Sequence, residues 1–218
     1  MSNFDYVLFD FDGTMVDSSE GIFKSLIYAL ESAGCEKPSD ETLRKFIGPP
    51  IYDSFRDLFG FDEEMIGYMI KKYRERYRAK GLEEVSVYAG IPELFRTLKE
   101  NGIKTATASS KPTEFIEKIL KDKGLYDCVD YIGGTAFDEK DSGKTAILNR
   151  SLEALGCTDR SRAVMVGDRK YDIDGAKGAG IKTVAVLYGF GSEEEFRRHN
   201  AEYIVNDTKE IEKIILGD

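Results

Sequence analysis

Two aspartates, Asp10 and Asp12, lie two residues apart directly after a short apolar run, residues 6–9. Such a run, ending in acidic residues and a glycine, is typical of a buried strand followed by a turn. Closely packed carboxylates repel each other, so one is readily protonated or both need a cation. The pair could supply a nucleophile, an acid–base group or a metal site, although an ordinary acidic turn has the same composition. A calcium loop of the EF-hand type does not fit, because that loop needs its glycine at position six and Gly13 is at position four.

A second acidic segment, containing Asp168 and Asp172, follows another apolar run, residues 163–167. If both segments end strands of one sheet, their carboxylates make a site lined by oxygen alone. Hard oxygen ligands favour Mg²⁺ over transition metals. The single histidine, His199, argues against a histidine-built zinc site and against a Ser-His-Asp triad.

Two further segments could bind an anion. Ser109 and Ser110 follow a strand-like segment and precede Pro112, a residue suited to the first turn of a helix. A hydroxyl followed by amides at a helix start attracts phosphate. Lys144 opens another predicted helix and could neutralise phosphate charge. Taken alone, a serine before a helix is usually a cap and a lysine is usually solvated.

The elements that must position these residues alternate between strand and helix. This alternation predicts a doubly wound parallel α/β sheet with helices on both faces. In such sheets ligands bind at the carboxyl ends of the strands, which is where the polar residues fall. The predicted strands are residues 6–9, 103–108, 129–132, 163–167 and 182–187, and the predicted helices between them are 91–100, 112–123, 144–155 and 173–179.

The segment from residue 16 to residue 84 shows no strand signal. It contains helical patterns over residues 22–33, 39–47, 51–59 and 62–80. We therefore expect a core domain of residues 1–15 and 85–218. A second, smaller all-helical domain, residues 16–84, is inserted after the first strand.

The bulk properties limit the partners. The formal net charge of −9 argues against nucleic acid, because phosphate backbones need a basic surface. Three scattered cysteines, odd in number, fit reduced thiols in a cytoplasmic protein better than a disulfide framework. No apolar stretch approaches the length of a membrane span, so we expect no membrane partner.

Together these features resemble the haloacid dehalogenase superfamily. Residues 10–18 match its opening motif, and Ser109 matches the hydroxyl of the second motif. Lys144 matches the lysine of the third motif, and residues 167–172 match the fourth. The helical insert resembles the C1 cap of that superfamily. The resemblance covers essentially the whole chain.

The resemblance implies a chemical role for each matching residue. Asp10 would attack phosphorus and form an aspartyl-phosphate. Asp12 would protonate the leaving oxygen and then activate the hydrolytic water. Ser109, Ser110 and Lys144 would hold phosphate oxygens, and Lys144 would also screen Asp10.

The resemblance also implies a Mg²⁺ site. Its ligands would be Asp10, the backbone carbonyl of Asp12, and Asp168. Asp172 and Thr14 would stand beside these ligands, and Asp172 could reach the metal directly or through water.

Asp12 distinguishes between branches of the superfamily. Dehalogenases lack this second carboxylate, and transport ATPases carry threonine there. Sugar phosphomutases of the group resemble the chain equally in the core motifs, but they use a cap histidine, and residues 16–84 contain none. Hydrolysis of phosphate esters is therefore favoured. A phosphomutase and a non-catalytic phosphate-binding protein remain as alternatives.

Among the phosphatases the chain is most similar to the phosphoglycolate phosphatase group, which includes pyrophosphatases and nucleotide phosphatases. The supporting segments are residues 17–18, 46–50, 109–112 and 188–191. We expect a small phosphorylated metabolite as substrate and a monomer or homodimer. Substrate specificity is assigned to Arg44, Lys45, Gly48 and Lys111, although a solvated helix face and a turn would explain the cap residues equally well.

Overall fold

The computed structural model describes residues 2–136 and 143–217, which divide into two compact units. The first unit combines Met1–Val16 with Val87–Asp218, and the second is Asp17–Ser86. The second unit begins one residue and ends two residues after the predicted insert, residues 16–84. The chain crosses between the units at β2 (Val16–Asp17) and β3 (Ser86–Val87), which pair as a two-stranded sheet.

Six parallel strands form the sheet of the first unit, in the order β5-β4-β1-β6-β7-β8. The central strand β1 has β4 on one side and β6 on the other. This is the point at which strand order reverses, where doubly wound sheets bind their ligands. The prediction of a parallel α/β sheet is confirmed. The strands are β1 (Tyr6–Phe9), β4 (Lys104–Pro112), β5 (Tyr131–Thr135), β6 (Ala163–Gly167), β7 (Lys182–Val186) and β8 (Tyr203–Val205).

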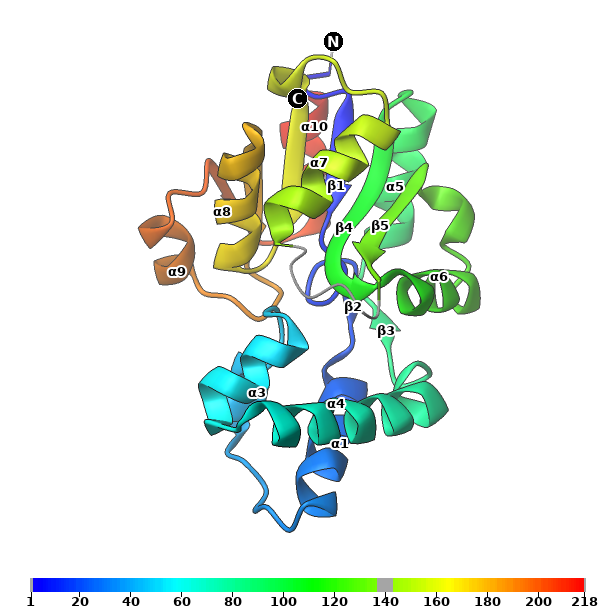
Figure 1. Cartoon of the computed structure of the whole chain (residues 1–218). Coiled ribbons are helices and arrows are strands. Elements are labelled where there is room, and N and C mark those ends of the chain that lie inside the picture. The colour runs from blue at the N-terminus through cyan, green and yellow to red at the C-terminus, as the bar shows by residue number, and fades with distance from the viewer. Residues whose placement is uncertain (1, 137–142, 218) are drawn as a thin grey trace. The chain divides into compact units, whose positions relative to one another are not determined.

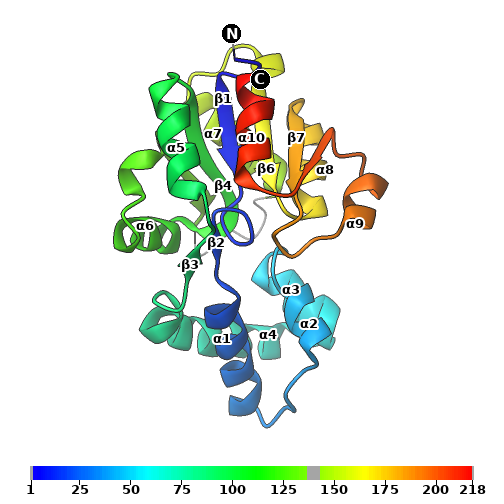
Figure 2. The same cartoon turned by 180° about the vertical axis from the view of Figure 1, so that it is seen from behind.

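Helices cover both faces of this sheet, which is why its central strands are continuous apolar runs. Figure 1 shows α7 and α8 on one face, and Figure 2 shows α5 and α10 on the other. Leu8 packs into the core on the α7 and α8 side, whereas the ring of Phe9 lies 4.7 Å from that of Phe95 in α5. The helices of this unit are α5 (Ile91–Glu100), α6 (Thr113–Asp122), α7 (Lys144–Ala154), α8 (Lys170–Ala179), α9 (Glu193–Arg198) and α10 (Thr208–Leu216).

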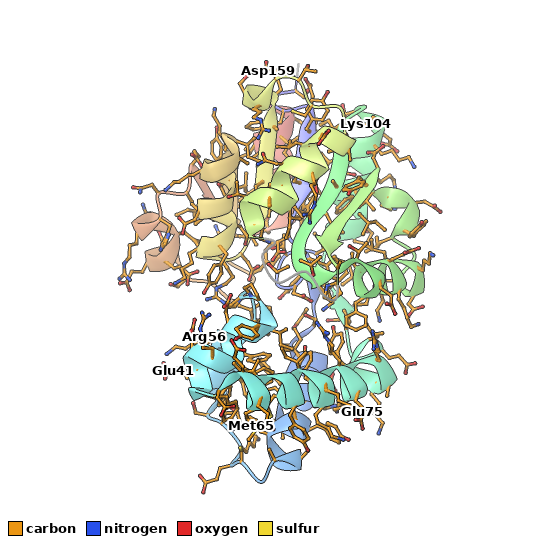
Figure 3. The ribbon with its side chains drawn as sticks, in the orientation of Figure 1. Glu41, Arg56, Met65, Glu75, Lys104 and Asp159 are labelled. Atoms are coloured by element: carbon orange, nitrogen blue, oxygen red, sulfur yellow. The ribbon has the colours of Figure 1, made fainter. Side chains whose placement is uncertain are left out.

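The two edges of the sheet differ in their chemistry. Lys104, the first residue of β4, and Asp159, which precedes β6, lie at the amino-terminal edge (Figure 3). Asp10 and Asp12 follow β1, Ser109 and Ser110 lie in the last part of β4, and Asp168 follows β6, all at the opposite, carboxyl-terminal edge. The fold therefore gathers them at one end of the strands.

The second unit is helical, as the sequence predicts. Its core is aromatic: the rings of Phe46 and Phe55 are 5.1 Å apart, and those of Tyr73 and Tyr77 stack at 5.5 Å. Its elements are α1 (Ser19–Ser32), α2 (Asp40–Lys45), α3 (Ile51–Phe59), α4 (Glu63–Arg76) and a π-helical turn (Tyr77–Gly81).

The expectation of one regular helix over residues 62–80 is wrong. The α-helix ends at Arg76 and a wider π turn follows. In this turn the carbonyl oxygen of Gly81 approaches Gly21 of α1 so closely that a Cβ on Gly21 would lie 2.4 Å from it. This contact between two backbones cannot be read from hydrophobic spacing, because both contacting residues lack side chains.

The expected helix start at Pro112 is also wrong. Strand β4 continues to Pro112, with an irregular register against β5 after Ala108, and α6 begins at Thr113. At the other acidic segment, α8 begins at Lys170 rather than residue 173, so Asp172 belongs to a helix.

None of the helices in the described residues is both long and apolar enough to span a bilayer.

Candidate active site

Lys144 is the centre of the site. Its Nζ lies 2.8 Å from Asp10 Oδ1 and 2.7 Å from Asp172 Oδ1, and it donates to the carbonyl oxygen of Ala108 at 2.9 Å. Burial lowers the pKa of Lys144, but Asp10 and Asp172 outweigh burial and raise it overall. The lysine is therefore a fixed positive charge at the end of β1.

Asp168 follows β6 and is fully buried. One of its oxygens accepts a hydrogen bond from Thr14 Oγ1 at 3.2 Å, and the other accepts from the backbone N–H of Phe190 at 2.8 Å. Burial, then Asp10 and Asp172, raise the pKa of Asp168 well above its usual range. Ionisation of this side chain calls for a further positive charge.

Gly13 lets the loop after β1 pass directly against Asp168. Its φ is +87°, a conformation that favours glycine. A Cβ on Gly13 would lie only 2.2 Å from Asp168 Oδ2. The glycine of the opening motif is thus required by both the turn and the close approach.

Asp172 lies in the first turn of α8. Its Oδ2 accepts a hydrogen bond from the backbone N–H of Arg169 at 3.0 Å, while Oδ1 makes the ion pair with Lys144. Burial raises the pKa of Asp172 to about 6, with Lys144 opposing the rise and Asp10 adding to it. The residue is both a helix cap and a member of the charged cluster.

Asp10, Asp168 and Asp172 together form a candidate metal cluster. Each offers a carboxylate oxygen, and the three oxygens lie within 4.8 Å of one another. The three carboxylates share a buried space, and the ammonium group of Lys144 pairs with those of Asp10 and Asp172. A divalent cation with oxygen ligands would match this charge and donor set. The cluster therefore fits the metal that the sequence predicts.

Asp12 has a different neighbour. Lys111 Nζ contacts Asp12 Oδ1 at 2.9 Å and Oδ2 at 3.1 Å, and the lysine side chain is only 6% exposed. The backbone N–H of Lys111 also donates to Ser109 Oγ at 3.3 Å. The sequence assigns Lys111 to substrate specificity, and this assignment stays a prediction. In the structure Lys111 joins the end of β4 to Asp12, the carboxylate expected to transfer protons.

The two serines do not occupy a helix start. Ser109 is buried and Ser110 is partly buried, and both lie in the irregular last part of β4. The carbonyl oxygen of Ser110 accepts from Thr135 Oγ1 at 3.2 Å. Pro112 takes the cap position of α6 and has no N–H, and no side chain caps the first-turn amides that follow it. The assignment of the serines to phosphate binding stays a prediction.

The cap candidates belong to the helical unit. Arg44 and Lys45 are exposed at the end of α2, where Lys45 pairs with Glu41 at 2.6 Å. Gly48 follows in the next turn with a φ of +112°. Their assignment to substrate specificity stays a prediction.

Two residues that support the acidic loops were not foreseen as site residues. Tyr188 donates to the carbonyl oxygen of Thr14 at 3.0 Å, and Phe190 supplies the N–H that binds Asp168. Their segment, residues 188–191, supports the family resemblance, but nothing in its pattern predicts these contacts. Glu195 of α9 accepts the backbone N–H of Lys170 at 2.7 Å, at the start of α8, and a single glutamate in an acidic helix carries no sequence signal for such a contact.

Fold and site together define a hydrolase-type α/β protein with an acidic centre at the strand ends. A family model described as haloacid dehalogenase-like hydrolase matches residues 7–186, and the chain belongs to that family. The predictions of this family and of a phosphoric monoester hydrolase are confirmed.

Three curated relatives resemble the chain over most of its length. A 5'-nucleotidase of Pseudomonas aeruginosa is 35% identical, covering 96% of this chain and 94% of its own. Pyrophosphatase PpaX of Halalkalibacterium halodurans is 33% identical, covering 96% and 95%. A phosphoglycolate phosphatase of Aquifex aeolicus is 33% identical, covering 84% and 85%. A solved structure, of a predicted phosphatase from Clostridium acetobutylicum, is 41% identical with a TM-score of 0.93 and covers 99% of both chains.

Proposed function

We propose that this chain is a Mg²⁺-dependent phosphatase that hydrolyses small phosphate monoesters through an aspartyl-phosphate at Asp10. The observation that carries the proposal is the buried ion pair between Asp10 Oδ1 and Lys144 Nζ, at 2.8 Å, inside the three-carboxylate cluster. The pair holds one oxygen of Asp10 beside a buried positive charge. The carboxylate is then oriented for in-line attack.

The reaction uses two carboxylates in turn. An oxygen of Asp10 forms a bond to phosphorus as the bond between phosphorus and the ester oxygen breaks. Asp12 gives a proton to the departing oxygen and afterwards takes one from the water that hydrolyses the aspartyl-phosphate. The ammonium group of Lys111, beside Asp12, holds that carboxylate in place between the two steps. Ser109 and Lys144 bind the phosphate oxygens.

The metal would be held by Asp10, Asp168 and the backbone carbonyl of Asp12, with Asp172 and Thr14 beside them. When bound, Mg²⁺ offsets the repulsion between the carboxylate and the anionic ester. Thr14 and the backbone of Phe190 orient Asp168 for this purpose, since each donates to one of its oxygens. The ammonium group of Lys144 offsets part of the negative charge of Asp10 and Asp172.

The substrate class follows from the relatives, whose names refer to nucleotides, pyrophosphate and phosphoglycolate. We propose a small phosphorylated metabolite, with phosphoglycolate-like esters first and pyrophosphate or nucleoside monophosphates as alternatives. Contacts to the variable part of the substrate are assigned to Arg44, Lys45 and Gly48 of the helical unit. Residues 16–84 contain no histidine, which disfavours a phosphomutase. A cytoplasmic location, no nucleic-acid or membrane partner, and a monomer or homodimer complete the proposal.

The test is release of phosphate from an aryl phosphate, followed by a panel of phosphorylated metabolites ranked by kcat/KM. Chelation of metal by EDTA and the substitution Asp10→Asn should each abolish release. Asp174→Asn is the matched control, because Asp174 is an exposed aspartate of α8 outside the cluster. Full activity of Asp10→Asn would refute the mechanism. A product isomer in place of free phosphate would indicate a phosphomutase.

A further inference from the structure

The loop that follows β7, residues 188–191, lies directly against Asp168. Two of its residues are glycines, and the approach requires both: a Cβ on Gly189 would overlap the Cβ of Asp168, and a Cβ on Gly191 would overlap its carbonyl oxygen. Between the glycines, the backbone N–H of Phe190 donates to Asp168 Oδ2 at 2.8 Å. Three consecutive residues thus fix the main chain and one carboxylate oxygen of Asp168.

Tyr188, the first residue of this loop, reaches the other carboxylate oxygen through an intermediate. Its hydroxyl donates to the carbonyl oxygen of Thr14 at 3.0 Å, and Thr14 Oγ1 donates to Asp168 Oδ1 at 3.2 Å. Thr14 is fully buried, and a buried carbonyl oxygen takes its hydrogen bonds from the protein. The position of Thr14, and with it the donor to Asp168, therefore depends on the hydroxyl of Tyr188.

The ring of Tyr188 is held by a contact that does not involve its hydroxyl. The ring lies 4.9 Å from that of Tyr88, whose backbone N–H donates to the carbonyl oxygen of Met15 at 3.2 Å. Burial, then Asp168 and Tyr88, raise the pKa of Tyr188, so the phenol keeps its proton and remains a donor at neutral pH. Removal of the hydroxyl alone leaves the ring contact in place, and the hydrogen bond to Thr14 can be tested by itself.

We propose that Tyr188 is a positioning residue of the metal site, which holds Thr14 so that its side chain orients Asp168. The inference rests on the proposed function, because it takes the carboxylate cluster to be a Mg²⁺ site. Phe190 fixes one oxygen of Asp168 and Thr14 fixes the other, and Tyr188 determines where the second donor lies. Hydrogen-bond partners behind a metal ligand set its orientation and its affinity for the metal. Loss of the Tyr188 hydroxyl should therefore weaken Mg²⁺ binding.

The test is calorimetric titration of the whole protein with MgCl₂, without substrate. Tyr188→Phe should raise the dissociation constant about 3- to 10-fold, the effect of losing one hydrogen bond of ordinary strength. Tyr6→Phe is the matched control. The hydroxyl of Tyr6 also donates to a backbone carbonyl oxygen, that of Gly156 at 3.4 Å, but Tyr6 is the first residue of β1, at the opposite edge of the sheet. This variant should bind Mg²⁺ as the wild type does.

A second set of variants tests the route through Thr14. Thr14→Val removes the hydroxyl that reaches Asp168 and should weaken Mg²⁺ binding about 10- to 100-fold. The double variant Thr14→Val, Tyr188→Phe should bind within about twofold of Thr14→Val alone, because Tyr188 then has no donor to position. If Thr14→Val fails to fold, Thr14→Ala replaces it, since it removes the same donor.

Two results would overturn the proposal. One is an unchanged dissociation constant in Tyr188→Phe, even with a lower melting temperature, which would mean that the tyrosine only supports the fold. The other is a double variant that binds weaker than Thr14→Val by the full effect of Tyr188→Phe, which would mean that Tyr188 does not act through Thr14. A wild-type protein that binds no Mg²⁺ would instead refute the proposed function, and with it this inference.

Discussion

At the scale of single residues, two lysines hold the aspartates of the site and have different tasks. Lys144 joins Asp10 to Asp172, whereas Lys111 holds both oxygens of Asp12. Lys144 pairs with the buried carboxylates of Asp10 and Asp172 and with the carbonyl oxygen of Ala108, and the side chain of Asp12 beside Lys111 is only 15% exposed. Each lysine therefore holds one carboxylate in place, Asp10 for the proposed nucleophilic attack and Asp12 for the proposed proton transfers.

Replacing Lys144 by methionine should affect both stability and turnover. The change leaves the buried carboxylates of Asp10 and Asp172 without the ammonium group they share, and breaking a buried ion pair costs about 3–5 kcal/mol. We expect the free energy of unfolding to fall by that order in urea titrations without metal, and kcat to fall by about 100-fold or more. Lys118→Met is the control, because Lys118 pairs with Asp122 at half-exposed positions. Equal stability of the two variants would contradict this account.

Replacing Lys111 by alanine decides between two roles. If Lys111 positions Asp12, kcat should fall about tenfold or more while KM changes little, because only the transition state loses an interaction. If Lys111 contacts the substrate, as the sequence predicts, KM should rise with kcat nearly unchanged. Steady-state kinetics on one substrate separate the two results.

The sequence predicted the identity of the cluster residues but not these pairs. Aspartates after β1 and β6 are visible as acidic residues behind apolar runs, and parallel strands must bring them together. The partner of Lys111 was not foreseen, since the irregular end of β4 determines where its side chain points. Glu195 was missed for a related reason: its contact depends on how α9 packs against α8.

At the scale of elements, the approach of α7 to α8 places Lys144. Gly175 of α8 faces the stem of Lys144, and a Cβ there would lie 2.5 Å from Lys144 Cγ and 2.8 Å from its Cβ. The end of the lysine cannot retreat, because Asp10, Asp172 and Ala108 hold it. Gly175 thus leaves room for Lys144, the first residue of α7, to pass α8 and reach Asp10.

The substitution Gly175→Ala should therefore disturb the site from a distance. Overpacking of this kind costs about 1–3 kcal/mol. We expect a lower melting temperature and a lower kcat/KM, since Lys144 must shift from Asp10. Gly67→Ala is the matched control, because Gly67 is an exposed helical glycine with nothing within 4 Å of a new Cβ. That variant should be neutral or stabilised by up to about 1 kcal/mol. A Gly175→Ala protein with wild-type activity and stability would contradict the positioning of Lys144 by α8.

The boundaries of the helices and strands show which parts of the fold the sequence pattern predicts and which it does not. Strands β1, β6 and β7 were predicted almost to the residue, because buried parallel strands are continuous apolar runs. The boundary between β4 and α6 was not, since Pro112 fits both a first helical turn and a strand end. The π turn after Arg76 was missed because it depends on the contact between Gly81 and Gly21.

At the scale of the whole molecule, every contact described for the site lies within the α/β unit. The chemistry is therefore built into one unit, and we propose that choice of substrate belongs to the other. The net charge of −9 includes the buried cluster, whose charges need a cation or protons.

The metal-free protein should lose stability as the pH rises. The pKa of Asp172 is raised by burial from its ordinary 3.8 to about 6, and that of Asp168 is raised as well. The folded protein therefore binds more protons than the unfolded chain between these values. Protonation of Asp172 therefore contributes to the free energy of unfolding. This contribution is fully present below about pH 4 and is lost as the pH rises through about 6. Melting curves in EDTA from pH 4 to pH 8 measure this loss.

Two comparisons assign the loss to the cluster. Asp172→Asn keeps an oxygen for the backbone N–H of Arg169 but cannot ionise, so its melting temperature should depend less on pH. Added Mg²⁺ should raise the melting temperature of the wild type more at pH 7 than at pH 5, because protons occupy the cluster at the lower pH. The same stabilisation by Mg²⁺ at both values would contradict the assignment.

The central claim is that Asp10 becomes phosphorylated during turnover. Acid quenching of the enzyme with substrate and Mg²⁺, followed by borohydride reduction, converts an aspartyl-phosphate into homoserine, which peptide mass spectrometry locates. We expect the modification at position 10, only when substrate and Mg²⁺ are both present, and none in Asp10→Asn. Continued release of phosphate with no reducible intermediate, or with the modification at another aspartate, would contradict the account.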